Sequence, residues 1–235
     1  MSMKIEIWSD VVCPWCYIGK RRFEAALAEF EHADDVEVLW RSFQLDPNAP
    51  DSRQLTESPD ELLAKKMGRP LEQVRAMQAQ VTSIAASVGL QYRLDLTRPG
   101  NTFDAHRLLH LALEHGLQDP LKERFDAATF TEGLSVSDPD ELTRLAVEVG
   151  LDEARVRQVL DSDEFADAVR ADESQARAYG ISGVPFFVID GRYGVSGAQE
   201  SAAILSVLRQ AWQERNPVEV VAGGAPACEG EDCAI

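Results

Sequence analysis

The pattern of hydrophobic and polar positions predicts that the chain begins with a strand, a helix and a second strand. Residues 4–8 alternate in polarity and are rich in β-branched and aromatic side chains, as half-buried strands are. From Tyr17 onward apolar residues recur at helical spacing, and we expect this helix to end near Ala33. Residues 36–43 carry apolar side chains on both faces of a second predicted strand. The opening is therefore a β-α-β unit.

A long block of helical patterns separates this unit from the final strands. A connector rich in Pro, Asp and Ser covers residues 46–59, and helical periodicity then recurs in seven segments: 62–67, 71–88, 102–115, 120–131, 139–149, 153–160 and 164–179. Residues 186–189 form a continuous apolar strand, residues 193–195 can pair back on it, and residues 198–212 close with an amphipathic helix. This order predicts an α/β protein, β-α-β then β-β-α, interrupted by an all-helical insertion.

The same order divides the chain into three expected parts. Residues 1–45 and 180–214 would form the α/β domain, and residues 46–179 would form the helical insertion domain. Residues 215–235 are rich in Pro, Gly and acidic side chains, and we expect them to form a flexible, cysteine-containing C-terminal tail.

Composition narrows the class of protein. Of the 235 residues, 45% are hydrophobic and 27% are charged, which is typical of a globular chain. The 23 Lys and Arg against 40 Asp and Glu give a net charge of −17, which repels phosphate backbones and anionic lipid. Nucleic acid and membranes are therefore not expected partners. No stretch approaches the about 18 apolar residues of a membrane span, and residues 1–10 lack secretory signal features, so we expect a cytoplasmic protein.

Candidate chemistry begins with Cys13, Pro14, Trp15 and Cys16, which follow the first strand and open the first helix. Unpaired backbone N–H groups and the helix dipole would stabilise a thiolate at Cys13, which we expect to be an exposed nucleophile. Cys16 would lie one turn further on, partly buried, where it could resolve a mixed disulfide. Pro14 fits because the first helical position needs no N–H. The alternatives are half of a zinc site or two unrelated cysteines.

A second signal is Pro185, which stands directly before the apolar strand 186–189. Proline is tolerated at the first residue of a strand, where its missing N–H does no harm. A cis peptide bond after Val184 would explain the placement. The alternative is an ordinary loop proline.

Three segments resemble the FrnE-type branch of the DsbA thiol-disulfide oxidoreductases: SDVVCPWCYIGK (9–20), NTFDAHR (101–107) and GISGVPFF (180–187). The resemblance covers nearly the whole chain. It implies a thioredoxin fold interrupted by a helical insertion, with a catalytic dithiol formed by Cys13 and Cys16 and with a cis Pro185 facing it.

The resemblance also implies that the substrates are protein or small-molecule disulfides or dithiols. We expect the substrate to contact four side chains: Pro14, Trp15, Val184 and His106. The periplasmic oxidant of the family has histidine at the position of Trp15, so this chain lacks an imidazolium that would stabilise the thiolate. That difference argues against a strongly oxidising role.

The same superfamily contains enzymes that use glutathione, namely the kappa-class transferases and the hydroxychromene-carboxylate isomerases. They carry serine at the first motif position and lack the resolving cysteine, so Cys13 and Cys16 argue against them. They remain the alternative enzyme class, with glutathione as a co-substrate, and we expect no other cofactor.

Cys228 and Cys233 form a second pair in the expected tail, and some FrnE-type proteins resemble this chain in that feature. The resemblance suggests a second redox pair that relays electrons to or from the active dithiol. The alternatives are a metal-binding tail, a pair without a partner, or a redox sensor whose four cysteines surround zinc.

Two further polar features of the sequence permit more than one interpretation. His106 and His110 have metal-ligand spacing, but Arg107 stands where a zincin has glutamate, so we expect an ordinary amphipathic helix and no metal. Asp10 could tune the Cys13 thiolate or shuttle its proton, and it could equally be a surface turn residue.

Overall fold

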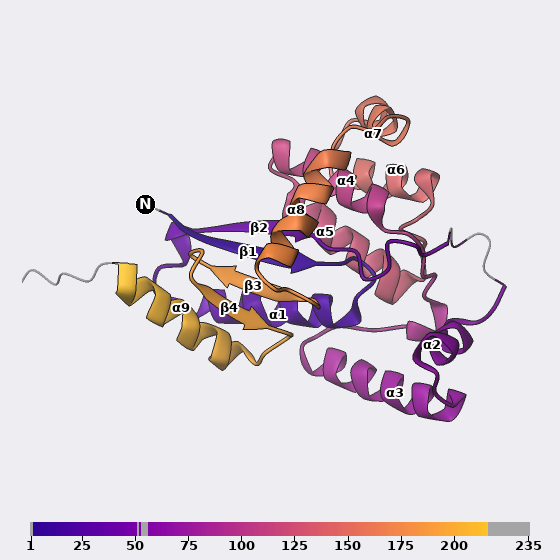
Figure 1. The fold of residues 1–235 in the computed structure, drawn as a ribbon, viewed down its shortest axis with the longest axis horizontal. Helices are drawn as coiled ribbons and strands as arrows, with labels where there is room; N and C mark the ends of the chain where they lie inside the picture. Colours follow the sequence, from indigo (N-terminus) through magenta and orange to yellow (C-terminus); the bar gives the residue numbers. More distant parts are fainter. Residues whose placement is uncertain (1, 51, 53–55, 216–235) are drawn as a thin grey trace, which may run out of the picture.

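The computed structural model describes residues 2–50, 52 and 56–215, and these contain a four-stranded mixed sheet (Figure 1). The strands lie in the order β2-β1-β3-β4, with the bounds β1 (Met3–Ser9), β2 (Val36–Ser42), β3 (Phe186–Ile189) and β4 (Tyr193–Ser196). β1 is parallel to β2 and antiparallel to β3, and β3 and β4 form an antiparallel hairpin. The two central strands, β1 and β3, therefore come from segments that are far apart in the sequence.

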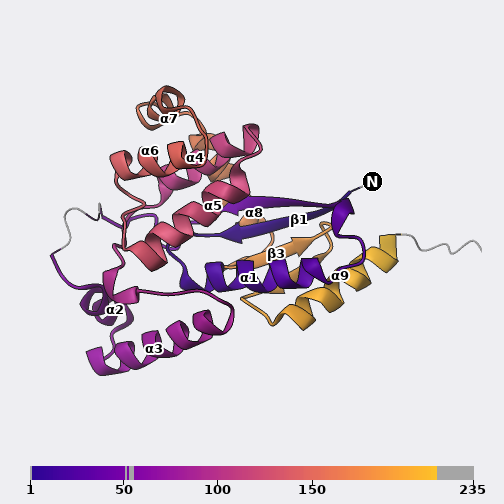
Figure 2. The same ribbon diagram turned by 180° about the vertical axis from the view of Figure 1, so that it is seen from behind.

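Helices cover both faces of the sheet, as Figures 1 and 2 show. Two lie together on one face, α1 (Pro14–Ala28) and α9 (Ser201–Arg215). Because side chains alternate along a strand, Ile5 and Ile7 of β1 face this pair and pack in one core with Phe23 of α1. Trp8 points to the opposite face and packs against Ala176 of the helix that covers it, α8 (Ala166–Ala178).

The helices between β2 and β3 have a core of their own. Their bounds are α2 (Pro59–Met67), α3 (Leu71–Ser87), α4 (Phe103–Glu114), α5 (Gln118–Ala127), α6 (Pro139–Glu148) and α7 (Glu153–Leu160). Buried apolar side chains from four of these helices, including Leu108, Phe125, Leu145 and Val156, meet in one cluster. Since the sheet has the thioredoxin strand order, the predicted thioredoxin fold with a helical insertion is confirmed. No helix in the described part of the chain is long and apolar enough to cross a bilayer.

Some predicted helix bounds are wrong, among them those of the last helix, which covers Ser201–Arg215 and not 198–212. The first helix ends at Ala28 and not near Ala33, because the chain turns where the Phe30 N–H donates to the Leu27 carbonyl at 3.1 Å. Phe30 is buried there and closes the end of the core, so apolar periodicity continues past the last helical residue. The segment predicted as one helix over 120–131 is α5 followed by a π-helical turn, Ala128–Glu132.

The insertion is fastened to the sheet by Asp172 of α8. Its Oδ2 accepts the Ser42 N–H at 2.9 Å and lies 3.1 Å from His110 Nε2, while its Oδ1 accepts from Arg41 at 3.1 Å. Burial raises the pKa of the Asp172 carboxyl, but these donors outweigh burial and bring the pKa below its usual value. The backbone carbonyl of Asp172 also accepts the Trp8 indole N–H at 2.9 Å. Helix α8, which lies inside the predicted insertion, thus forms one layer of the α/β domain.

We expect Asp172→Ala to lower the free energy of unfolding by about 3–5 kcal/mol, because it leaves buried donors unpaired. Asp167→Ala, at an exposed position of the same helix, should leave the stability close to that of the wild type. The Asp172 carboxyl has a lowered pKa in the folded protein, so its contribution is present above the ordinary value and is lost as the pH falls through the folded value. Urea unfolding at pH 7 and at acid pH measures both effects. A small, pH-independent difference would contradict this role.

Candidate active site

The two cysteines of the C-P-W-C motif lie at the start of α1. Cys13 is the N-cap residue with an extended backbone, and Pro14 takes the first helical position. The Cys13 N–H donates to the Asp10 carbonyl at 3.2 Å, and the Cys16 N–H donates to the Cys13 carbonyl at 2.9 Å. Both cysteines are free thiols in this structure. The strand, turn and helix predicted around the motif are those observed.

The loop before β3 packs against this dithiol. The Val184–Pro185 peptide bond is cis, and the Cys13 thiol donates to the Val184 carbonyl at an S···O distance of 3.5 Å. Pro185 packs on α1 at Gly19, where an added Cβ would lie 2.8 Å from the proline ring. Trp15, 38% exposed, is the most accessible residue of the motif. Residues from both ends of the chain therefore meet at one sulfur.

The burial of the two thiols differs from expectation. Cys13 is 4% exposed and Cys16 is fully buried, whereas the sequence suggested an exposed first thiol and a partly buried second one. The difference arises because the Val184 loop, which is distant in sequence, packs onto the Cys13 sulfur. Burial, together with the neighbouring Cys13, raises the pKa of the Cys16 thiol well above its usual value, so Cys16 is protonated at neutral pH.

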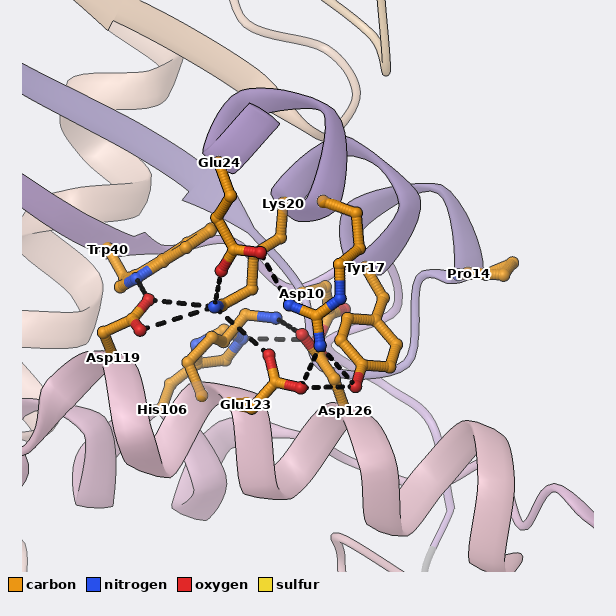
Figure 3. Close-up of polar contacts among 12 residues, drawn as sticks. Asp10, Pro14, Tyr17, Lys20, Glu24, Trp40, His106, Asp119, Glu123 and Asp126 are labelled. Atoms are coloured by element: carbon orange, nitrogen blue, oxygen red, sulfur yellow. Dashed lines mark hydrogen bonds and ion pairs between the residues drawn. The ribbon is translucent and has the colours of Figure 1, made fainter. Parts of the chain in front are cut away.

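A cluster of charged side chains joins α1 to α5 (Figure 3). Lys20, whose side chain is 2% exposed, lies 3.2 Å from Asp119 and 3.1 Å from Glu123 and also pairs with Glu24. The Tyr17 hydroxyl donates to Glu123 at 2.5 Å, and burial followed by this contact raises the pKa of the tyrosine. These pairs compensate the burial of the lysine charge between the two helices.

A second ionic pair lies deeper, between Lys122 and Asp126 of α5, and both side chains are buried. Burial raises the pKa of the Asp126 carboxyl to about 6, although the Lys122 charge opposes the rise. The Lys122 charge also lowers the pKa of the Cys16 thiol, in opposition to burial, so this lysine acts electrostatically on the resolving cysteine. Among the described residues Asp126 Oδ1 meets no hydrogen-bond donor. A buried acid-base pair therefore lies on α5, and its lysine influences Cys16 through its charge.

Asp10 is buried, so its interpretation as a surface turn residue is wrong. Its Oδ2 accepts the Leu45 N–H at 2.8 Å, and its Oδ1 lies 3.3 Å from His106 Nε2. The turn before Cys13 is thereby attached both to the end of β2 and to α4. His106 is buried behind Asp10, and its contact with substrate stays a prediction.

His110 contacts Ser42 and Asp172 and does not share a site with His106. Within the described ranges no group of three or more His, Cys, Asp or Glu side chains is arranged to hold a metal ion. Cys228 and Cys233 lie outside the described residues, so the relay and the four-cysteine zinc site stay predictions.

Sequence reasoning missed the residues that the insertion contributes, namely Tyr92, Glu123, Lys122 and Asp126. The last two offered a signal, because they are four positions apart on the same stripe of α5 as the buried Leu121 and Phe125. Charged residues on an apolar stripe indicate a buried ion pair.

The sheet order, the dithiol at a helix N-terminus and the facing cis proline define a thioredoxin-fold protein of the oxidoreductase class. Residues 4–209 match the DSBA-like thioredoxin domain, and the chain belongs to this family.

Three similar proteins place the chain further. The probable DsbA oxidoreductase of Streptomyces coelicolor is 46% identical with a TM-score of 0.87, and the match covers 99% of each chain. The uncharacterised protein YwbO of Bacillus subtilis is 32% identical over 193 residues, which are 80% of this chain and 88% of that protein. A 2-hydroxychromene-2-carboxylate isomerase has a TM-score of 0.68 over 92% of this chain and 100% of that one, but at 14% identity this likeness concerns the fold alone.

We expect Gly19→Ala to destabilise the protein and to displace the Pro185 loop, because the added methyl group would lie 2.8 Å from the proline ring. Overpacking costs about 1–3 kcal/mol, and the better helix propensity of alanine returns about 1 kcal/mol. Gly183→Ala is the matched control, since an added Cβ there meets no atom within 4 Å. Thermal unfolding measures the stability of both variants. A Gly19→Ala variant that is more stable than the wild type would contradict this packing.

Proposed function

We propose that this protein is a thiol-disulfide oxidoreductase of the cytoplasm that exchanges disulfides through Cys13 and Cys16. The observation that carries the proposal is the arrangement of the two sulfurs. Cys13 is the N-cap of α1 and contacts the Val184 carbonyl, while Cys16 is buried one turn away. Membership of the DsbA-like family supports oxidoreductase chemistry at this site.

The exchange proceeds in two balanced steps. The Cys13 thiolate attacks one sulfur of the substrate disulfide, so a mixed disulfide forms and the other substrate sulfur leaves as a thiolate that takes up a proton. Cys16 then loses its proton and attacks the Cys13 sulfur, which releases the second substrate thiolate. The substrate gains two electrons and the protein now holds a Cys13–Cys16 disulfide. The reverse sequence oxidises a substrate dithiol.

The substrate of this reaction is a protein or small-molecule disulfide that lies beside Val184 and Pro185. Pro14 and the exposed Trp15 would border it on the opposite side. Cys13 is only 4% exposed, and its sulfur contacts the Val184 carbonyl. In this proposal the substrate sulfur therefore approaches beside that carbonyl, or the loop that carries Val184 moves away.

Resolution requires a base, because burial keeps the Cys16 thiol protonated. We assign this role to Asp126, whose carboxyl has a pKa of about 6 and whose Oδ1 has no hydrogen-bond donor in the described part of the chain. Lys122 would stabilise the Cys16 thiolate as it forms, since its charge lowers the pKa of that thiol.

Glutathione enters this proposal as a co-substrate that reduces the Cys13–Cys16 disulfide. The alternative, a glutathione-dependent isomerase or transferase, is supported by a likeness of fold alone. It would not use Cys16, which is buried one turn from Cys13 on α1. Assistance by Cys228 and Cys233 is a further part of the proposal that concerns residues outside the described ranges.

We expect Cys13→Ser to abolish disulfide exchange, because the attacking sulfur is lost. Cys16→Ser should still attack and should accumulate a mixed disulfide between Cys13 and the substrate. Mass spectrometry after reaction with a disulfide-bonded peptide, under non-reducing conditions, detects the adduct. Loss of exchange in both variants without any adduct would count against these roles, and isomerase activity that survives Cys16→Ser would favour the alternative.

We expect Asp126→Asn to slow resolution at least tenfold at pH 7 and to leave the first attack by Cys13 unchanged, because general-base catalysis contributes about 10²–10⁴-fold in rate. The wild-type resolution rate should rise with pH through about 6, as Asp126 loses its proton, and the variant should lack that rise. Stopped-flow measurement of each step tests this expectation, with urea unfolding as a check of the fold. An unchanged pH profile would rule out Asp126 as the base.

A further inference from the structure

Tyr92 brings a rigidly held hydroxyl group from the insertion to the active-site helix. Tyr92 is 6% exposed, and its ring packs in a cluster of three stacked rings with Tyr17, at a centroid distance of 6.2 Å, and Phe130, at 5.1 Å. The next residue, Arg93, donates its backbone N–H to the Phe130 carbonyl at 2.6 Å. Ring stacking and this backbone bond together fix the position of the hydroxyl.

The Tyr92 hydroxyl donates to the Pro14 carbonyl at 2.6 Å. That carbonyl is one end of the peptide group whose other end is the N–H of Trp15. Trp15 is the second residue of α1, and N–H groups at this position of a helix point toward the N-cap side chain, here Cys13. Tyr92 therefore acts on the opposite end of a peptide group that faces the nucleophile.

The Trp15 N–H is available as a donor. Among the described residues it has no acceptor, whereas the Cys16 N–H is occupied by the Cys13 carbonyl. In the thiol form Cys13 itself donates, to the Val184 carbonyl. The Cys13 thiolate has no proton to donate to the Val184 carbonyl and needs a hydrogen-bond donor instead. The Trp15 N–H, at the start of α1, is such a donor.

We propose that Tyr92 is a positioning residue that strengthens the hydrogen bond from the Trp15 N–H to the Cys13 thiolate by polarising the Pro14–Trp15 peptide group. A carbonyl that accepts a hydrogen bond makes the N–H of the same peptide group a better donor, by about 10–30% per bond. This inference rests on the proposed function, since it concerns the nucleophile of that reaction.

Tyr92 does not act as an acid or base in this arrangement. Its proton is committed to the Pro14 carbonyl, and burial, followed by the nearby Asp126 and Cys13, raises the pKa of the hydroxyl far above its usual value. The hydroxyl is therefore a permanent donor through all steps of the exchange.

The test is the alkylation rate of Cys13 in Tyr92→Phe, which keeps the stacked ring and removes only the hydroxyl. We expect alkylation by iodoacetamide at pH 7, followed on the Cys13 peptide by mass spectrometry, to be about twofold to fourfold slower than in the wild type, because less thiolate is present. The two rates should converge at a pH at which both proteins are fully ionised. The equilibrium with glutathione should shift toward the Cys13–Cys16 disulfide by the same factor, and threefold corresponds to about 14 mV.

Tyr17→Phe is the matched control, because it removes another hydroxyl of the same aromatic cluster, one that donates to Glu123 and not to the Pro14 carbonyl. Its alkylation rate should equal that of the wild type. The amide proton of Trp15 in the NMR spectrum gives a readout that needs no reaction, and it should move upfield in Tyr92→Phe and stay in place in Tyr17→Phe.

Three results would overturn the inference. They are equal alkylation rates in Tyr92→Phe and the wild type, a slower rate in the variant that persists at high pH, and an equal effect of Tyr17→Phe. Each of these would leave the proposed function intact as long as the wild-type dithiol is reactive. A wild-type protein whose Cys13 reacts no faster than a free thiol and forms no disulfide with Cys16 would instead overturn the proposed function, and the role of Tyr92 with it.

Discussion

The first turn of α1 carries both sulfurs of the dithiol, and the backbone groups of this turn must be hydrogen-bonded if the sulfurs are to keep their positions. Several distant parts of the structure provide these hydrogen bonds. The Asp10 carbonyl accepts the Cys13 N–H, and the carboxylate of the same residue fixes the end of β2 through Leu45. On the other side of the turn Tyr92 holds the Pro14 carbonyl. The dithiol is thus supported by residues that follow β1 and β2 and by a residue of the insertion.

The insertion contributes specific polar contacts to this arrangement. Its helix α5 faces α1 with buried charges, and its helix α8 covers one face of the sheet through Asp172. In a chain with a net charge of −17, the buried Lys20 pairs with carboxylates of both α1 and α5, and the buried Lys122 pairs with Asp126 of its own helix. The pairs of Lys20 with α5 orient α1 against the insertion, because a misplaced helix would leave the lysine charge buried without a partner.

The sequence was sufficient to predict the order of elements and the dithiol, and both depend on local pattern. Cys13 and Cys16 are recognised from the strand before them and the helix after them, and Pro185 from the strand that follows it. The burial of Cys13 could not be predicted, because the loop that covers it is more than a hundred residues away in sequence. Asp10 was ambiguous for the same reason, since its partner His106 belongs to another helix. Side chains whose partners come from distant segments have no periodic signature.

The position of β1 in the middle of the sheet has a consequence for synthesis. A ribosome makes the chain from the N-terminus, so Cys13 and Cys16 emerge early, while Val184 and the strand that pairs with β1 emerge near the end. Until then β1 has only β2 beside it, and the Cys13 sulfur has no loop packed on it. In a nascent chain the Val184 loop therefore does not yet cover the Cys13 sulfur, and the complete site exists only after translation has passed Ile189.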